Sequence, residues 1–171
     1  MITRFVTLLF AAALSLTLAR PAFAIESCGG MLMPVMQLKQ VSRGYSAYHS
    51  GVDLMAPYGS PLRAAAGGTV VFAGTYFGYG NMIDIALPDG TITRYGHLSR
   101  FAPGLRTGTA LQTGDLIGAV GTSGHAHGPH LHFEVRVNGH AVDPKPFISL
   151  AVCTKGPATE HIEEARALAP R

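Results

Sequence analysis

The stretch HLHFEVRV, residues 130–137, alternates polar and apolar side chains without a break. Successive side chains of a β-strand point to opposite faces, so this period of two predicts a strand with one face in a core. On the other face His130 and His132 lie about 7 Å apart, at a rise near 3.4 Å per residue, and can address one ligand. The strand therefore predicts a metal ligand beside a catalytic base or acid. The core face would carry Leu131, Phe133, Val135 and Val137.

The sequence from Val52 to Val142 has the same strand-and-turn character. Short β-branched runs alternate with glycine, proline and asparagine, which adopt the backbone angles of tight turns. Pro88-Asp89-Gly90, between two such runs, predicts a β-hairpin. Closely spaced short strands favour a mainly β fold, a compact antiparallel β-sheet closed as a barrel or sandwich, over a βαβ fold.

The first 24 residues are typical of a secretory signal peptide. Arg4 precedes the apolar run Phe5–Ala19, and Ala22-Phe23-Ala24 matches an A-x-A cleavage site. The alternative is an uncleaved anchor, although the apolar run is short for a membrane span. We expect four segments: a signal peptide at 1–24, an irregular lead-in at 25–44, a folded domain at 45–150 and a tail at 151–171. The tail either forms a short helix after Thr159 or is frayed.

Charge and cysteine content fit an exported chain. The sequence has 13 Lys+Arg and 10 Asp+Glu, and two of the bases, Arg4 and Arg20, fall in the leader. The nearly neutral remainder has no basic run, so we expect no nucleic-acid partner. Without its leader the chain is expected to be periplasmic or secreted and free of the membrane. Cys28 and Cys153 would meet an oxidising compartment there, which favours a disulfide over two free thiols.

A second pair of ligand-type side chains lies in HSGVD, residues 49–53. His49 and Asp53 are four residues apart, and Gly51 with the β-branched Val52 favours an extended or looped segment over a helix. One imidazole, one carboxylate and a further imidazole give three protein ligands, the arrangement that leaves a catalytic Zn²⁺ one open position for water. Such a site lowers the pKa of bound water and polarises a carbonyl group.

Taken together, these motifs resemble the LytM/lysostaphin-type zinc metallopeptidases, peptidase family M23. The resemblance covers residues 45 to 145. Its motifs are HSGVD at 49–53, AAAGGTVVFAG at 64–74, GYGN at 78–81, DGTITRYGHLS at 89–99, LQTGDLIGAVGTSG at 111–124, GPHLHFEVRVNG at 128–139 and the final Asp143-Pro144. It implies a compact antiparallel sheet with a groove over the metal. It also implies peptidoglycan stem peptides or cross-bridges as substrates.

The resemblance implies that His49, Asp53 and His132 bind one Zn²⁺ ion. His97 and His130 would be two active-site histidines that do not bind the metal. Since no HExxH glutamate is present, they are the available proton carriers, and the sequence leaves open which is the base. The expected protein is a monomeric zinc endopeptidase that hydrolyses amide bonds in peptidoglycan cross-links.

Two other functions compete with this one. A non-catalytic member of the same family could activate or regulate other cell-wall hydrolases, although such relatives typically lose zinc ligands. The hairpin-like runs at 67–71 and 111–118 also resemble biotinyl or lipoyl carrier domains. A carrier needs a lysine at a hairpin tip, whereas the lysines Lys39, Lys145 and Lys155 all lie elsewhere.

Several neighbours of the expected site have two interpretations. His125 and His127 are either solvated loop residues or part of the groove, including a weak second metal site. Glu134 and Arg136 either orient a ligand imidazole or form a surface pair. Tyr95 would share a strand face with His97, and either lines the groove or packs in the core.

Overall fold

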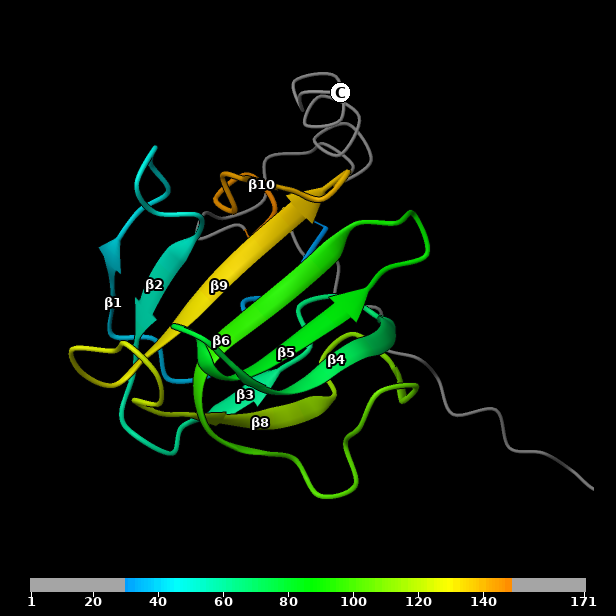
Figure 1. Ribbon diagram of the computed structural model, residues 1–171, viewed down its shortest axis with the longest axis horizontal. Coiled ribbons are helices and arrows are strands. Elements are labelled where there is room, and N and C mark those ends of the chain that lie inside the picture. The colour runs from blue at the N-terminus through cyan, green and yellow to red at the C-terminus, as the bar shows by residue number, and fades with distance from the viewer. Residues whose placement is uncertain (1–29, 149–171) are drawn as a thin grey trace, which may run out of the picture.

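The computed structural model describes residues 30–148, and these residues form ten strands of one antiparallel sheet (Figure 1). The mainly β prediction is confirmed. The predicted leader, both cysteines and the predicted C-terminal helix lie outside the described residues. Within residues 30–148 we find no helix long and apolar enough to span a bilayer. The strands are β1 Gln40–Arg43, β2 Val52–Met55, β3 Pro61–Arg63, β4 Gly68–Tyr76, β5 Gly80–Ala86, β6 Ile92–Phe101, β7 Ala110–Leu111, β8 Leu116–Val120, β9 His130–Val137 and β10 His140–Val142.

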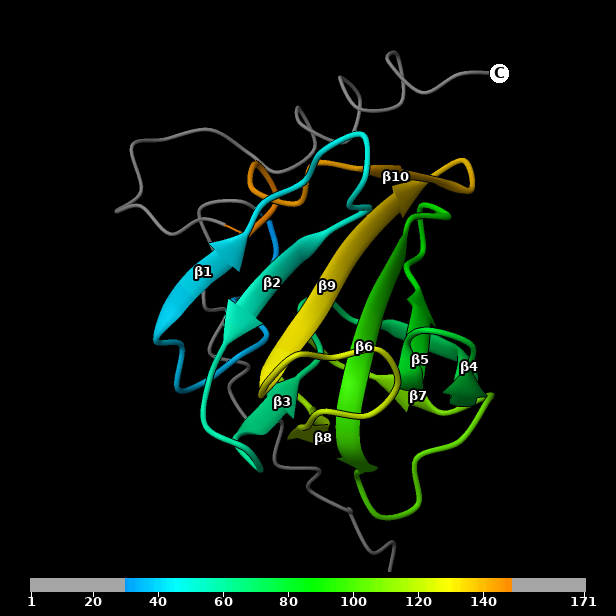
Figure 2. The same ribbon diagram turned by 60° about the vertical axis from the view of Figure 1, so that its left-hand side comes forward.

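The main path of the sheet runs β1-β2-β9-β6-β5-β4-β7, and β10 pairs with the far end of β9. Strands β3 and β8 pair with each other, and β8 also pairs with the end of β6. Figures 1 and 2 show β9 and β6 side by side across the middle of the sheet, with β3 and β8 below them. Strand β6 therefore belongs to the main sheet in its first half and leads into the β3–β8 layer in its second.

The alternation of β9 produces the predicted core. Its apolar side chains are at most 1% exposed and pack against apolar side chains from β2, β5, β6 and β8. Tyr95 of β6 lies among them, fully buried, with its ring centroid 5.3 Å from that of Phe133. Its hydroxyl accepts a hydrogen bond from the Ala65 N–H at 2.8 Å, and burial raises the pKa of Tyr95 to about 12. Tyr95 is therefore a core residue, and of its two interpretations the packed one is confirmed.

Strand β6 contains a β-bulge where it passes the groove. Asn81 of β5 pairs with Leu98, and Ile83 pairs with Tyr95, so Gly96 and His97 together oppose one residue of β5. His97 takes a φ of 65°, in the left-handed region that residues other than glycine rarely adopt. The bulge turns His97 to the groove, while Tyr95 faces the core. The prediction that these two side chains share a face was wrong, because a simple period of two assumes an unbroken strand.

The turns follow their sequence signals. Residues 87–90 close the predicted hairpin between β5 and β6, with the Leu87 N–H donating to the Thr91 carbonyl at 2.8 Å. Asn138 and Gly139, at φ 52° and 79°, form the two-residue turn between β9 and β10. Upstream of β1, Met31 and Val35 are both 3% exposed, so this part of the lead-in packs on the domain core.

Candidate metal centre

Three side chains from two neighbouring strands and the loop before them converge on one point. His49 Nε2 lies 3.0 Å from Asp53 Oδ1 and 3.1 Å from His132 Nδ1, and the third edge, from His132 Nδ1 to Asp53 Oδ1, is 2.9 Å. The β2–β9 register creates this triangle, because Asp53 pairs directly with His132. Ligands about 2.0–2.1 Å from a tetrahedral zinc ion are separated by roughly 3.3 Å, so the triangle needs little adjustment to bind one.

In each imidazole, the ring nitrogen that faces away from the triangle donates a hydrogen bond to the protein. His49 Nδ1 donates to the Gly44 carbonyl at 2.8 Å, and His132 Nε2 donates to the Glu134 carboxylate at 3.0 Å. A carbonyl oxygen can only accept, so the neutral His49 ring carries its proton on Nδ1 and leaves the Nε2 lone pair facing inward. The Glu134 carboxylate likewise only accepts, so a neutral His132 ring carries its proton on Nε2 and its Nδ1 lone pair faces inward. Two nitrogen lone pairs and one carboxylate oxygen thus point at the same space.

The charges of the triangle fit a cation. Burial alone would raise the pKa of Asp53, but the hydrogen bond from His132 and the nearby imidazoles of His49 and His130 outweigh burial and lower it. Burial would lower the pKa of His132, but its hydrogen bonds to Asp53 and Glu134 raise it. In the metal-free protein a proton on His132 Nδ1, directed to Asp53, is therefore held more strongly than by a free imidazole. A metal ion would replace that proton, and imidazole and carboxylate ligands suit zinc.

Glu134 lies directly behind His132 and is fully buried. Its carboxylate accepts hydrogen bonds from the Ser50 and Tyr79 hydroxyls, each at 2.6 Å, and from the Arg136 guanidinium at 2.6 Å, besides the one from His132. Burial alone would raise the pKa of Glu134, but these donors lower it to about 2. The interpretation that Glu134 orients a ligand imidazole is thereby favoured over a pair on the sheet surface, and Glu134 fixes which nitrogen of His132 faces the centre.

His97 and His130 lie beside the triangle with their ring centroids 4.7 Å apart. His97 Nδ1 donates to the Ser123 carbonyl and His130 Nδ1 to the Gly128 carbonyl, both at 2.8 Å. Each neutral ring therefore keeps its lone pair on Nε2, and His130 Nε2 is 3.7 Å from Asp53 Oδ1. Burial, and then the neighbouring His130 and His132, lower the pKa of His97 although its bond to Ser123 opposes this. The neutral form of His97 is therefore favoured over its protonated form.

Glycines fix the loop that supplies these two carbonyl groups. Gly80 and Gly124 approach so closely that a side chain at either would overlap the backbone of the other segment. Ser123 adds two hydrogen bonds, accepting from the Asn81 N–H at 2.9 Å and donating to the Leu98 carbonyl at 2.7 Å. The loop is therefore anchored beside the β6 bulge, and its Ser123 carbonyl lies in place for His97.

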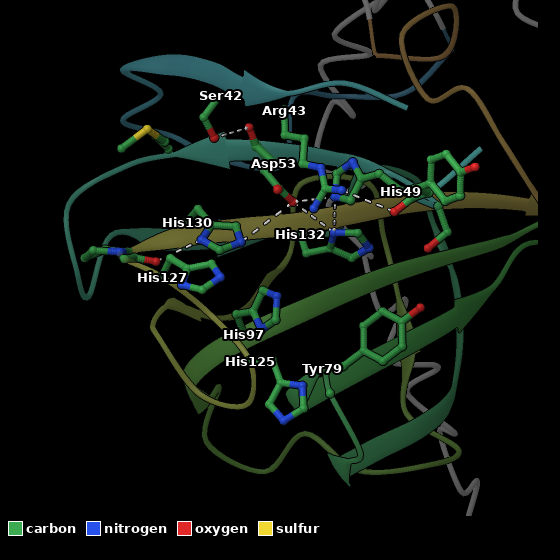
Figure 3. A pocket seen from close by; sticks show the side chains of 16 residues that line it. Ser42, Arg43, His49, Asp53, Tyr79, His97, His125, His127, His130 and His132 are labelled. Carbon is green, nitrogen blue, oxygen red and sulfur yellow. Dashed lines mark hydrogen bonds and ion pairs between the residues drawn. The ribbon is translucent and has the colours of Figure 1, made fainter. Parts of the chain in front are cut away.

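These side chains line a groove of about 570 Å³ (Figure 3). All five predicted site residues, His49, Asp53, His97, His130 and His132, are among its lining residues. His125 and His127 also line the groove, although both residues are exposed to solvent. They are therefore both solvated loop residues and part of the groove. Within residues 30–148 the only three-residue group arranged to hold a metal ion is the His49–Asp53–His132 triangle. Arg43, Tyr48 and Tyr79 are among the groove residues that the sequence interpretation overlooked.

Comparison with known proteins identifies the family. The model of Peptidase family M23 matches residues 47–144, more than half of the chain. The chain belongs to peptidase family M23. The family resemblance noted in the sequence is therefore confirmed.

Individual M23 proteins are similar over the same region. DD-carboxypeptidase/endopeptidase Mpg of Neisseria meningitidis is 42% identical over 106 residues, which are 62% of this chain but only 23% of Mpg. The catalytic domain of lysostaphin from Staphylococcus simulans is 34% identical with a TM-score of 0.59, over 63% of this chain and 90% of that domain. A zinc-containing peptidase from Vibrio cholerae is 30% identical with a TM-score of 0.61, over 64% of this chain and 37% of that one. The M23 fold is thus shared, while the match spans about a quarter of the curated Neisseria protein.

Only part of the site machinery has a recognisable signal in the sequence. The five histidine and aspartate residues have side chains that can bind a metal or carry a proton. Tyr79 stands in Gly78-Tyr79-Gly80-Asn81, which belongs to the family resemblance but was interpreted only as a turn. Tyr79 nevertheless donates to Glu134, and its ring centroid lies 5.5 Å from that of His132. The match of GYGN to the family is the signal that could have drawn attention to Tyr79.

Proposed function

We propose that this M23 protein is an exported zinc endopeptidase that hydrolyses amide bonds in the peptide cross-links of peptidoglycan. The observation that carries the proposal is the triangle of His49 Nε2, Asp53 Oδ1 and His132 Nδ1, with edges of 2.9–3.1 Å, while His49 Nδ1 and His132 Nε2 bond to groups outside it. The activity named for Mpg, DD-carboxypeptidase/endopeptidase, and the zinc named for the Vibrio cholerae peptidase support the same conclusion. The leader-like first 24 residues support a periplasmic or secreted location.

In this proposal His49, Asp53 and His132 bind one Zn²⁺ ion. When bound, zinc polarises the scissile carbonyl and lowers the pKa of a water molecule in the open position. Glu134 keeps the His132 ring in the ligand orientation by accepting from Nε2.

His97 and His130 are the proposed proton carriers. Each has its Nδ1 proton held by a backbone carbonyl and its Nε2 directed to the groove, so each Nε2 can accept a proton from the attacking water. Once protonated, the same nitrogen can donate to the developing oxyanion or to the leaving amine. Two such imidazoles 4.7 Å apart allow one to accept while the other donates.

The test combines metal analysis with mass spectrometry of peptidoglycan digests. We expect about one zinc ion per purified wild-type chain, from the three-ligand site, and release of cross-link fragments. His49→Ala and Asp53→Ala should lose the metal and the activity while keeping the circular dichroism of the folded sheet, because the core lies on the other face of β2 and β9. Exposed His140 offers a matched control, and His140→Ala should keep both.

A wild-type protein that carries zinc, binds peptidoglycan and releases no fragments would contradict the enzyme proposal. That outcome would favour the alternative of a non-catalytic regulator of other wall hydrolases. Retention of zinc by Asp53→Ala would contradict the assigned ligand set.

A further inference from the structure

We propose that Arg43 forms a carboxylate-binding subsite of the groove, and that the substrate therefore carries a free carboxylate close to the scissile amide. This inference rests on the proposed function and narrows its substrate. It selects cross-linked stem peptides, which bear free carboxylates, over neutral oligoglycine bridges.

The position of Arg43 is set by the same strand pairing that builds the metal centre. Arg43 is the last residue of β1, and its Cα partner on β2 is Asp53. Partners across an antiparallel pair have Cα atoms about 5 Å apart, so Arg43 begins within one strand spacing of a proposed ligand. Figure 3 shows its side chain pointing from β1 into the groove, of which it is a lining residue.

The loop after β1 holds the guanidinium in place. Arg43 Nη2 donates to the Tyr48 carbonyl at 3.2 Å, and the next residue, Gly44, accepts from His49 Nδ1. Ser46 and His49 close this loop with two reciprocal backbone hydrogen bonds of 3.0 Å each. The short loop that contains the proposed ligand His49 therefore begins directly after Arg43, and its Tyr48 carbonyl also accepts from the guanidinium.

The bond to Tyr48 occupies one of the five N–H groups of the guanidinium. Among residues 30–148 Arg43 is in no ion pair, whereas Arg94 and Arg136 are paired with Asp84 and Glu134. The exposed side chain thus faces the groove with donors in the planar geometry that matches a carboxylate.

The charge of the groove favours the same ligand. Asp53 is the single carboxylate among the residues that line it, and its charge is directed to His132 and to the cation that the triangle would bind. With zinc bound, the groove would carry net positive charge from the metal and from Arg43. An anionic peptide is attracted to such a groove, whereas a neutral glycine chain lacks this attraction between opposite charges.

The scale of the subsite limits where the carboxylate lies. An extended peptide advances about 3.3–3.6 Å per residue, and a guanidinium reaches several ångströms from its own Cα. The carboxylate that pairs with Arg43 should therefore belong to a residue one or two positions from the scissile bond.

Three soluble substrates test the subsite: a cross-linked dimer of stem peptides, the same dimer with its free carboxylates converted to amides, and pentaglycine blocked at both ends as its N-acetyl amide. We expect Arg43→Gln to raise KM for the carboxylate dimer roughly 10- to 100-fold, the usual effect of losing a charge-assisted hydrogen bond, with little change in kcat. Amidation should impose a similar loss on the wild type and no further loss on Arg43→Gln. Arg43→Lys, which keeps the charge but not the planar fork, should fall between them.

Arg106→Gln is the matched control, because Arg106 is exposed in the loop after β6 and does not line the groove. It removes the same charge and should leave all three KM values unchanged. The inference is overturned if amidation affects wild type and Arg43→Gln equally, or if the wild type cleaves pentaglycine as well as the carboxylate dimer.

Failure of the enzyme proposal would look different. If the zinc-loaded wild type cuts none of the three peptides, the endopeptidase assignment falls, and calorimetric titration of the uncut dimers then decides the subsite. Tighter binding of the carboxylate dimer that disappears in Arg43→Gln supports the subsite, whereas equal binding by both proteins overturns it.

Discussion

At the scale of single residues, the backbone conformation of His97 determines which variant tests its role. Its φ of 65° is costly for alanine but accessible to asparagine, which often adopts left-handed angles. We predict that His97→Asn folds and retains zinc but loses about 10²- to 10⁴-fold in activity, because the proton-accepting Nε2 is gone. Metal content and hydrolysis rate, measured on the same preparation, check both parts. Zinc loss in this variant would instead make His97 a ligand.

The same scale shows what motifs reveal and what they miss. His49, Asp53 and His132 could be predicted as converging because their residue types and motif context are specific. Arg43 could not be predicted, because its importance comes from the β1–β2 register that places it opposite Asp53. Burial of Glu134 was equally hidden, since alternation along β9 defines two faces but not that Ser50 and Tyr79 cover the polar one.

At the scale of strands, Gly51 controls how β2 meets β9. A Cβ at position 51 would overlap the Phe133 carbonyl and press on the Glu134 side chain. We predict that Gly51→Ala lowers the free energy of unfolding by about 2 kcal/mol or more, since rigid backbone cannot yield as a side chain would. Urea unfolding measures the change.

Gly128 supplies the control for that variant. Its added Cβ would meet open space and its φ is not positive, so Gly128→Ala should unfold at nearly the wild-type urea concentration. Equal stability of the two variants would show that the close approach of residue 51 to β9 can relax at little cost.

Regular strands could be predicted from the sequence, whereas their interruptions could not. β9 and the β5–β6 hairpin follow from period-two alternation and from Pro88-Asp89-Gly90. The bulge at Gly96–His97 carries no such mark, because it is imposed by the pairing of β6 with two different neighbours, β9 before it and β8 after it. Tertiary pairing here decides a local conformation that propensity alone leaves open.

At the scale of the whole molecule, Glu134 makes the stability of the metal-free protein depend on pH. Folding lowers the pKa of Glu134 from 4.5 to about 2. As pH falls, Glu134 is therefore protonated at a higher pH in the unfolded chain than in the folded protein. The stabilisation, about 3 kcal/mol for a fully buried side chain, is present above pH 4.5 and is lost as pH falls towards 2. We predict that Glu134→Gln removes this part of the acid dependence. Urea unfolding of both metal-free proteins between pH 5 and pH 2 checks it, and parallel curves would contradict it.

The left-handed angle at His97 also bears on how this family diverges. Glycine relieves that angle, so a copy of the fold released from proton chemistry could gain backbone stability by mutating position 97 to glycine, at the cost of the bond to Ser123. Substitutions at this position would therefore favour glycine. A family member with glycine at position 97 and the rest of the YGHL motif unchanged would be expected to fold into the same sheet but to have lost hydrolytic activity.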